Sequence, residues 1–341
     1  MGAILGILLI EHVIDVIQEL LPGFEGTCTE AEDFDAEADA VALEDAIGRG
    51  RIDDDVVNDI LPNRSNAQRQ EIQEQFMSLF GESLYDRVDS RVRRDRLRHV
   101  IKGMLLTPKQ YDARCLNQAM KGIGSSDDDV ICEILCARPN GYLEELKEVY
   151  EERYGNALMD DIQDNCRREF ERFMIAILCC AREEGLDAID EDQAAEDAQE
   201  LFDAGEDRWF FTDESVFTRI CARRSWMQIR LINAKYQEIS EDYDLLGAIE
   251  NEVNGDLKRA YKSIVRMALD PAYYFARNAH KALKGLGTDD DALQRAIIFT
   301  SEWGLQTIKE KYEESFGSSL ADDIDGDCCG DYKDMLLAIV K

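Results

Sequence analysis

Apolar residues recur along this chain at helical spacing, three or four positions apart. Leu293, Ala296 and Ile297 share one face of a predicted helix, and Leu305 and Ile308 share a face of the next. No segment shows the strict alternation of apolar and polar residues that is typical of a half-buried strand. The pattern therefore predicts an all-α protein.

Similar segments recur four times, with a period of roughly 75–85 residues. An aromatic residue followed by glycine closes a predicted helix at Phe80-Gly81, Tyr154-Gly155 and Phe316-Gly317, where glycine suits the left-handed position after a helix. A loop containing glycine, with Ser or Thr as the expected N-cap and acids after it, opens another helix in three repeats. We predict four repeats of about five helices each, over residues 34–105, 106–180, 193–270 and 271–341, with an acidic linker at 181–192.

The N-terminal tail and linker cover residues 1–33, and residues 1–21 are unusually apolar. Ile10, Ile14 and Ile17 share a face of a predicted helix, whereas Glu11 and Asp15 point elsewhere. No Lys or Arg precedes the apolar run and charges interrupt it, so it resembles neither a secretory signal nor a membrane-spanning helix. We expect this helix either to pack against the main body or to bind a partner protein, another copy or a membrane.

Charge restricts the partners of this protein. The chain has 341 residues, 39 Lys and Arg against 72 Asp and Glu, and a formal net charge of −33. Such a chain is repelled by nucleic acid and by anionic lipid, so binding to an anionic surface needs a bound cation or a local arginine patch.

The ten cysteines are expected to be reduced core residues. No catalytic constellation is apparent, so we predict no enzyme activity.

The most informative stretch is the glycine loop at residues 282–291, followed about forty residues later by the acidic segment 325–331. Glycines let the backbone turn tightly and direct several carbonyls at one point. Ca²⁺ takes roughly six to eight oxygen ligands, many of them carbonyls and often one bidentate carboxylate. The combination predicts a calcium site if the intervening helices bring the two segments together.

Several long segments resemble the annexin family, over about residues 34–341. They are Asn63–Gln70 in repeat 1, Asp197–Glu206 in repeat 3, and Lys284–Asp290 with Gly330–Lys333 in repeat 4. The resemblance implies a curved disc with calcium loops on its convex face and the N-terminal tail on the other side. It also implies calcium-dependent binding to anionic phospholipid.

The resemblance assigns candidate ligands to repeats 4 and 3. In repeat 4 these are the carbonyls of Leu283, Gly285 and Gly287 and the carboxylate of Asp327. In repeat 3 the loop is one residue longer than the family pattern. There the carbonyls of Gly205, Arg208 and Phe210 or Phe211, with the carboxylate of Glu252, are the candidates. Trp209, Phe210 and Phe211 either form an apolar wedge for the lipid interface or fold back into the core.

Repeats 2 and 1 depart further from the pattern. Repeat 2 keeps Met120, Gly122 and Gly124, but its loop is one residue longer and Asn165 stands at the carboxylate position, which leaves Asp164 as the possible substitute. Repeat 1 has Arg91 at that position, which excludes calcium. We expect Arg49, Arg51 and Arg91 either to contact lipid phosphate directly or to pair with surface acids.

The sequence therefore predicts a peripheral protein that binds anionic phospholipid through Ca²⁺. A calcium-weak scaffold, acting by self-association or by tail-mediated binding to a partner such as the cytoskeleton, is the alternative. The absence of a signal favours the cytoplasm, with export by another route left open.

Overall fold

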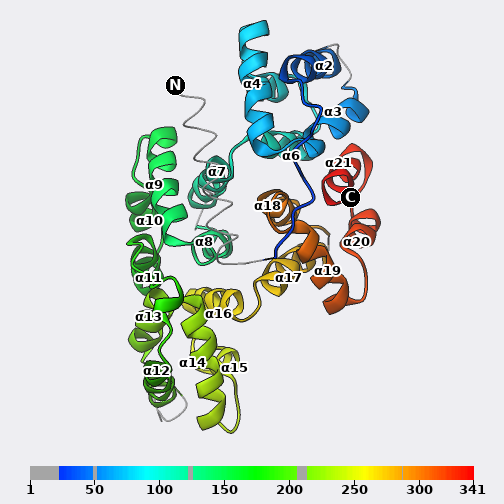
Figure 1. Ribbon diagram of the computed structural model, residues 1–341. Helices are drawn as coiled ribbons and strands as arrows, with labels where there is room; N and C mark the ends of the chain where they lie inside the picture. The colour runs from blue at the N-terminus through cyan, green and yellow to red at the C-terminus, as the bar shows by residue number, and fades with distance from the viewer. Residues whose placement is uncertain (1–22, 49–51, 122–125, 206–212, 286) are drawn as a thin grey trace. The chain divides into compact units, whose positions relative to one another are not determined.

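The computed structural model describes residues 23–48, 52–121, 126–205, 213–285 and 287–341, and helices account for most of them (Figure 1). These described residues contain no strand, so the all-α prediction is confirmed. The apolar helix predicted for residues 1–21 lies outside the described residues.

The chain divides into two compact units. Residues up to Tyr111 together with Phe275–Lys341 form the first unit, and Asp112–Tyr274 form the second. The first repeat contains α2 (Ala36–Gly48), α3 (Asp54–Ile60), the 3₁₀ turn η1 (Leu61–Asn63), α4 (Asn66–Phe80), α5 (Leu84–Arg91) and α6 (Asp95–Leu105). The fourth repeat contains α17 (Pro271–Leu283), α18 (Asp290–Thr300), α19 (Leu305–Phe316), α20 (Leu320–Asp327) and α21 (Gly330–Val340).

The second unit has the same organisation. Its first repeat contains α7 (Pro108–Met120), α8 (Asp128–Leu135), α9 (Asn140–Tyr154), α10 (Leu158–Asn165) and α11 (Arg168–Leu178). A short 3₁₀ turn, η2 (Leu186–Ala188), precedes α12 (Glu191–Ala204), α13 (Glu214–Arg223), α14 (Trp226–Ile239), α15 (Leu245–Glu252) and α16 (Gly255–Leu269). Glu191 and Asp192, which the sequence analysis assigned to the linker, belong to the first turn of α12.

Corresponding helices join the two repeats within each unit. In the first unit α21 packs against α3 and α6, and α18 also packs against α6 (Figure 1). In the second unit α16 packs against α8, and α11 against α13. The helices that follow the glycine loops therefore lie beside the last helix of the neighbouring repeat.

The aromatic-glycine pairs end helices as the sequence predicts. Gly81, Gly155 and Gly317 are the C-caps of α4, α9 and α19, with φ of 69°, 73° and 74°. Only glycine adopts this left-handed conformation without steric penalty. Each glycine therefore stops a long helix and starts the turn into the short helix that follows it.

The prediction that Ser or Thr caps the helix after the loop is wrong. The N-caps of α8, α13 and α18 are Asp127, Asp213 and Asp289, whose carboxylates accept hydrogen bonds from backbone N–H groups in the first turn. Aspartate is as good a cap as serine, and its charge also favours the positive end of the helix. The hydroxyl residue that precedes it is therefore available for another contact.

The segment before α2 connects the two repeats of the first unit. The N–H groups of Thr27 and Cys28 donate to the carbonyl of Ser301 in repeat 4, at 2.7 and 2.9 Å. Further along, the backbone of Ala31 exchanges two hydrogen bonds with the side chain of Gln68 at the start of α4, both of 2.9 Å. Residues 24–31 thus form a strap, the name used below, across repeats 4 and 1.

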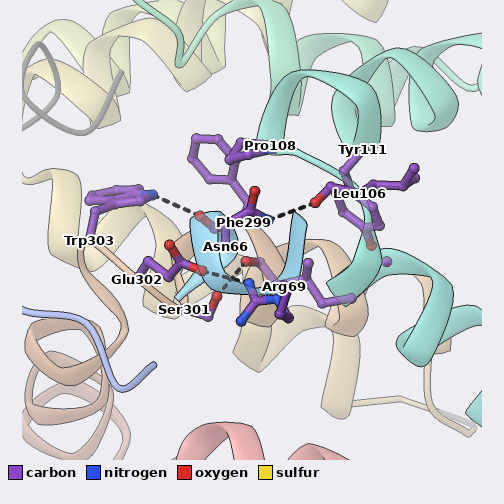
Figure 2. Close-up of a pocket in the computed structure, with 11 residues that line it drawn as sticks. Asn66, Arg69, Leu106, Pro108, Tyr111, Phe299, Ser301, Glu302 and Trp303 are labelled. Atoms are coloured by element: carbon purple, nitrogen blue, oxygen red, sulfur yellow. Dashed lines mark hydrogen bonds and ion pairs between the residues drawn. The ribbon is translucent and has the colours of Figure 1, made fainter. Parts of the chain in front are cut away.

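A buried ion pair lies beneath this strap. Arg69 of α4 donates to Glu302 at 2.5 Å and to the carbonyl of Met104 at 2.7 Å, and its side chain is almost completely buried. Figure 2 shows the two charged groups facing one another beside a small cavity that Asn66 and Trp303 also line. Within the segment Asn63–Gln70, Gln68 and Arg69 therefore have partners in the strap and in repeat 4.

All ten cysteines are free thiols, and seven of them are buried, in agreement with their expected role in the core. Within the described parts of the chain, no helix is long and apolar enough to cross a membrane.

Candidate metal-binding loops

One backbone hydrogen bond closes the corresponding loop in every repeat. The N–H of the capping aspartate donates to the carbonyl of an alanine at or near the end of the preceding helix. The pairs are Asp53 to Ala46 (3.0 Å), Asp127 to Ala119 (2.9 Å), Asp213 to Ala204 (2.9 Å) and Asp289 to Ala282 (2.8 Å). The loops enclose residues 47–52, 120–126, 205–212 and 283–288. Repeats 2 and 3 therefore carry loops one and two residues longer than that of repeat 4.

A second contact brings the candidate carboxylate to the loop in repeat 4. The hydroxyl of Thr288 donates to the backbone carbonyl of Asp327, the last residue of α20, at 3.3 Å. In repeat 2 the hydroxyl of Ser126 lies 3.3 Å from the carbonyl of Asn165, the last residue of α10, and shares its proton with the carboxylate of Asp128. The hydroxyls that do not cap a helix thus hold the loop against the end of a helix about forty residues later.

The four candidate positions are structurally equivalent. Arg91, Asn165, Glu252 and Asp327 are the last residues of α5, α10, α15 and α20, and each is followed by a buried residue. The four residues that the family resemblance placed at one position therefore lie at the ends of equivalent helices.

The repeat 4 loop is open to solvent and has the backbone conformation that its glycines permit. Gly285 and Gly287 have φ of 152° and 91°, a region that side chains with a Cβ rarely adopt. Both glycines and Asp327 are exposed, whereas Leu283 is buried and fixes the start of the loop. Leu286 lies outside the described residues.

The one positively charged side chain in the sequence of this loop, that of Lys284, pairs with an acid. The Lys284 ammonium lies 3.4 Å from a carboxylate oxygen of Asp323, and the same carboxylate accepts a 2.5 Å hydrogen bond from the hydroxyl of Tyr312. Burial pushes the pKa of Asp323 up, but hydrogen bonds from Tyr312 and Ser318 and the neighbouring Lys284 hold its pKa below the ordinary value. Asp323 therefore stays ionised and neutralises Lys284.

His280 packs beside Tyr312, the residue that binds Asp323. Its imidazole stacks on Phe316 with ring centroids 3.8 Å apart, and its Nδ1 lies 3.1 Å from the Tyr312 hydroxyl. Burial, together with the positive charge of Lys284, lowers the pKa of His280. The histidine thus tends to be neutral, and acts as a packing and hydrogen-bonding group.

Repeat 2 has the same supporting contacts but a neutral residue, Asn165, at the candidate position. Tyr150 bridges Asn117 and Asp161 with hydrogen bonds of 3.0 and 2.6 Å, as Tyr312 bridges His280 and Asp323. The Asn165 side chain offers only one neutral oxygen, and its amide nitrogen donates to the carbonyl of Asp161 at 2.8 Å. Asp164 is exposed and lies one residue before the position that contacts the loop. Met120 is buried at the end of α7, whereas Gly122 and Gly124 lie outside the described residues.

Repeat 3 brings Glu252 to the start of its loop. A Cβ added to Gly205 would meet the Cγ of Glu252 at 3.3 Å, so this side chain lies directly against the glycine. The remaining candidates, Arg208, Trp209, Phe210 and Phe211, lie outside the described residues.

Repeat 1 has a cation at the equivalent position. Arg91 is exposed at the end of α5, and Arg49 and Arg51 lie outside the described residues. Ion pairs with acids are formed by neighbouring arginines, whereas the two alternatives predicted for Arg49, Arg51 and Arg91 stay predictions. Arg87 contacts Glu44 and Glu82, both at 3.0 Å.

The donors in repeat 4 suit a hard cation. The described residues contain no cluster of three or more His, Cys, Asp or Glu side chains that could hold a metal. A site in this loop must therefore take most of its oxygens from backbone carbonyls, with Asp327 as the charged ligand. Carbonyl and carboxylate oxygens without nitrogen or sulfur are the set that Ca²⁺ prefers.

Comparison with known proteins identifies the family. The annexin family model matches residues 38–95, 111–177, 196–264 and 274–339, one segment for each repeat. Mouse annexin A13 is 36% identical over 307 residues, which are 90% of this chain and 95% of that protein. Mouse annexin A5 is 37% identical over 314 residues, covering 92% and 97%.

Solved structures agree. Annexin III superposes with a TM-score of 0.89 at 33% identity, over 93% of this chain and 97% of that one. A calcium-bound annexin, annexin (Sm)1, has a TM-score of 0.80 at 26% identity, over 93% of both chains. This protein is therefore a four-repeat helical protein of the annexin class. It belongs to the annexin family, whose general property is peripheral, calcium-dependent binding to phospholipid membranes.

Sequence reasoning missed the residues that support the loops. Asp161 and Asp323 each lie four residues before the last residue of α10 and α20, and each binds a tyrosine of the preceding long helix. An alignment of the four repeats on their helix ends would have revealed this shared acid. It is replaced by Arg87 in repeat 1 and by Ala248 in repeat 3.

Proposed function

We propose that this protein binds anionic phospholipid membranes in the presence of calcium, chiefly through the loop of repeat 4. The observation that carries the proposal is the hydrogen bond between Thr288 and the Asp327 carbonyl, which supports a carboxylate beside a solvent-exposed glycine loop. The carbonyls of Leu283, Gly285 and Gly287 would complete the ligand set with the Asp327 carboxylate.

Calcium, when bound, supplies a positive bridge between these protein oxygens and the phosphate oxygens of the lipid. Such a bridge is needed because a chain with a net charge of −33 is otherwise repelled by an anionic surface. Asp323 keeps the Lys284 ammonium paired, so the loop offers the cation carbonyl oxygens rather than a competing charge. Thr288 holds the end of the loop against Asp327, and the backbone N–H of Asp289 closes the loop on the carbonyl of Ala282.

The other repeats would contribute less. In repeat 3, Glu252 with the carbonyls of Gly205, Arg208 and Phe210 would form a wider site. Its neighbours Trp209 and Phe211, with Phe210, would enter the lipid interface. In repeat 2 the carbonyls of Met120, Gly122 and Gly124 would share a site with Asn165 or Asp164. A neutral amide ligand weakens a site for a hard dication.

Co-sedimentation with phosphatidylserine vesicles, with calcium and with a chelator, tests this function. We expect wild-type protein to bind only weakly in chelator and strongly in calcium. Asp327→Ala should need a clearly higher calcium concentration for half-maximal binding. The matched control is Asp325→Ala, because Asp325 lies on the same helix but pairs with Lys333 at 2.8 Å and does not contact the loop.

Equal calcium requirements for the Asp327 and Asp325 variants would contradict the assignment of the repeat 4 site. Absence of vesicle binding at any calcium concentration would contradict the function itself. That result would favour the alternative of a scaffold that self-associates or binds a protein partner through residues 1–21.

A further inference from the structure

We propose that Arg91 and Arg93, in the turn between α5 and α6, form a metal-independent site for the phosphodiester groups of anionic lipids. The inference rests on the membrane function proposed above and adds a contact that needs no calcium. It assigns a binding role to the repeat whose calcium site is lost.

The two arginines lie in the turn that corresponds to the one that carries the candidate carboxylate, Asp327, in repeat 4. Arg91 is the last residue of α5, as Asp327 is of α20. Both arginines are exposed, and the residue between them, Val92, is completely buried. The valine anchors the turn, so both guanidinium groups project from a fixed part of the backbone.

Ion pairs hold this turn next to two loops of the first unit. Arg94 pairs with Asp54 at 2.6 Å, and Asp54 is the first residue of α3, directly after the repeat 1 loop. Arg96 pairs with Asp290 at 2.7 Å, and Asp290 is the first residue of α18, directly after the repeat 4 loop. The turn therefore lies on the same face as the candidate calcium loop of repeat 4.

Arg91 and Arg93 differ from the other basic residues around them. Neither forms an ion pair with any residue that the structure describes, although the chain has an excess of acids. The remaining basic residues near this turn all pair with carboxylates: Arg87 with Glu44 and Glu82, Arg94 with Asp54 and Asp331, Arg96 with Asp290, Arg98 with Asp95 and Asp89, and Lys102 with Asp89. Among these residues, only Arg91 and Arg93 therefore carry a positive charge that no carboxylate of the described residues balances.

The chemistry of the two groups selects the ligand. A guanidinium presents a planar fork of donors that matches two phosphate oxygens, and it stays charged at any physiological pH. At the repeat 1 position a guanidinium would repel calcium, but beside the repeat 4 loop it would meet the same layer of lipid phosphates that calcium binds there. The site therefore complements the calcium loop.

The experiment compares Arg91→Gln/Arg93→Gln with wild type, using vesicles of phosphatidylserine and phosphatidylcholine at low ionic strength. Each basic residue close to an anionic membrane contributes a factor of about five to binding, so the double variant should lose roughly 30-fold. The loss should be the same in chelator and in calcium, because the two sites act separately. The control Arg153→Gln/Arg223→Gln removes the same charge from exposed residues in the last turns of α9 and α13, and should change binding less than twofold.

Three results would overturn the proposal: no loss in the Arg91 and Arg93 variant, an equal loss in the control, or a loss seen only when calcium is present. Inorganic phosphate at millimolar concentration distinguishes the source of the ligand. We expect it to leave the arginine-dependent binding in place, and full competition by it would instead indicate a site for free phosphate. Failure of the proposed calcium function would be recognised by a different result: neither calcium nor the Asp327→Ala change would alter vesicle binding.

Discussion

Phe275 and Trp303 form an edge-to-face aromatic pair in repeat 4, with ring centroids 5.4 Å apart, at positions that hold a salt bridge in the other three repeats. Phe275, like the acids of those pairs, lies seven residues before the loop alanine, and Trp303, like the arginines, directly precedes the N-cap of the next long helix. The pairs it replaces are Asp39–Arg64 (2.6 Å), Asp112–Arg138 (2.8 Å) and Asp197–Arg224 (2.6 Å). At these two positions repeat 4 therefore has two aromatic rings where the other repeats have a carboxylate and a guanidinium.

The exchange gives the strap an apolar surface to bind. Phe24 stacks on Trp303, with centroids 5.7 Å apart and ring planes at 25°. We expect Phe24→Ala to shift Trp303 fluorescence to longer wavelength and to lower the free energy of unfolding by about 1–2 kcal/mol, because an aromatic contact and its buried area are lost. Emission is measured with Trp209 and Trp226 changed to Phe, so that Trp303 is the one emitter.

Phe80→Ala is the control for this strap prediction, since Phe80 packs on Phe76 and not on Trp303. Gly26→Ala is an independent test, because a Cβ there would lie 2.2 Å from the backbone of Glu302 and must displace the strap. Unchanged Trp303 emission in both Phe24→Ala and Gly26→Ala would show that the strap does not control the environment of the tryptophan.

The buried pair Asp112–Arg138 allows the same exchange to be imposed on repeat 2. Both side chains are 3% exposed or less, so Asp112→Ala removes the carboxylate that balances the buried Arg138 guanidinium and should cost about 3–5 kcal/mol of stability. Replacing both residues with the repeat 4 pair, Asp112→Phe with Arg138→Trp, should cost much less, because no buried charge remains. Chemical denaturation measures both. A double variant as unstable as the single one would mean that the ion pair, and not the packing, is required at this position.

Arg168 is strained at a position where two other repeats have glycine. Its φ is 54°, and the equivalent Gly255 and Gly330 have φ of 64° and 63°. The left-handed region costs a residue with a Cβ about 1–2 kcal/mol, which the greater flexibility of unfolded glycine partly offsets. Arg168→Gly should therefore raise the unfolding free energy by about 1 kcal/mol.

The control for strain at this site is Arg168→Ala, which removes the charge but keeps the Cβ. It should bring no comparable gain. The reverse change, Gly330→Arg, should destabilise the protein by about 1–2 kcal/mol. If Arg168→Ala stabilised as much as Arg168→Gly, charge repulsion rather than backbone strain would be the cause.

We expect Asn165 to limit calcium binding in repeat 2, because it stands at the helix end where repeat 4 has Asp327. Asn165→Asp restores a carboxylate at the end of α10 and should lower the calcium concentration for half-maximal vesicle binding by roughly tenfold, since the number of charged ligands tunes calcium affinity. The change is made in protein that also carries Asp327→Ala, so that repeat 4 does not dominate the titration.

Asp164→Asn, in the same background, separates the two candidates for the repeat 2 ligand. It should have little effect, because Asp164 lies one residue before the position that Ser126 holds against the loop. A large loss on Asp164→Asn, with no gain on Asn165→Asp, would make Asp164 the ligand.

Local patterns in the sequence were sufficient for the repeats and for much of the site. The spacing of apolar residues predicted helices throughout, and Gly81, Gly155 and Gly317 marked helix ends because a left-handed C-cap has a strong residue preference. The resemblance to the annexin family also placed Asp327, Glu252, Asn165 and Arg91 at one position. These features depend on a few neighbouring residues, or on one repeat resembling the next.

Contacts between distant segments were decided by the tertiary structure alone. Nothing local indicates that Thr288 bonds to a carbonyl thirty-nine residues later, or that Asp323 holds Lys284, because such choices depend on how helices pack. The N-caps of α8, α13 and α18 are aspartates, although the neighbouring Ser and Thr residues were equally suited to cap a helix. Arg94 pairs with Asp331 and Arg96 with Asp290 because repeats 1 and 4 close into one unit, whereas Arg91 and Arg93 stay unpaired among the described residues.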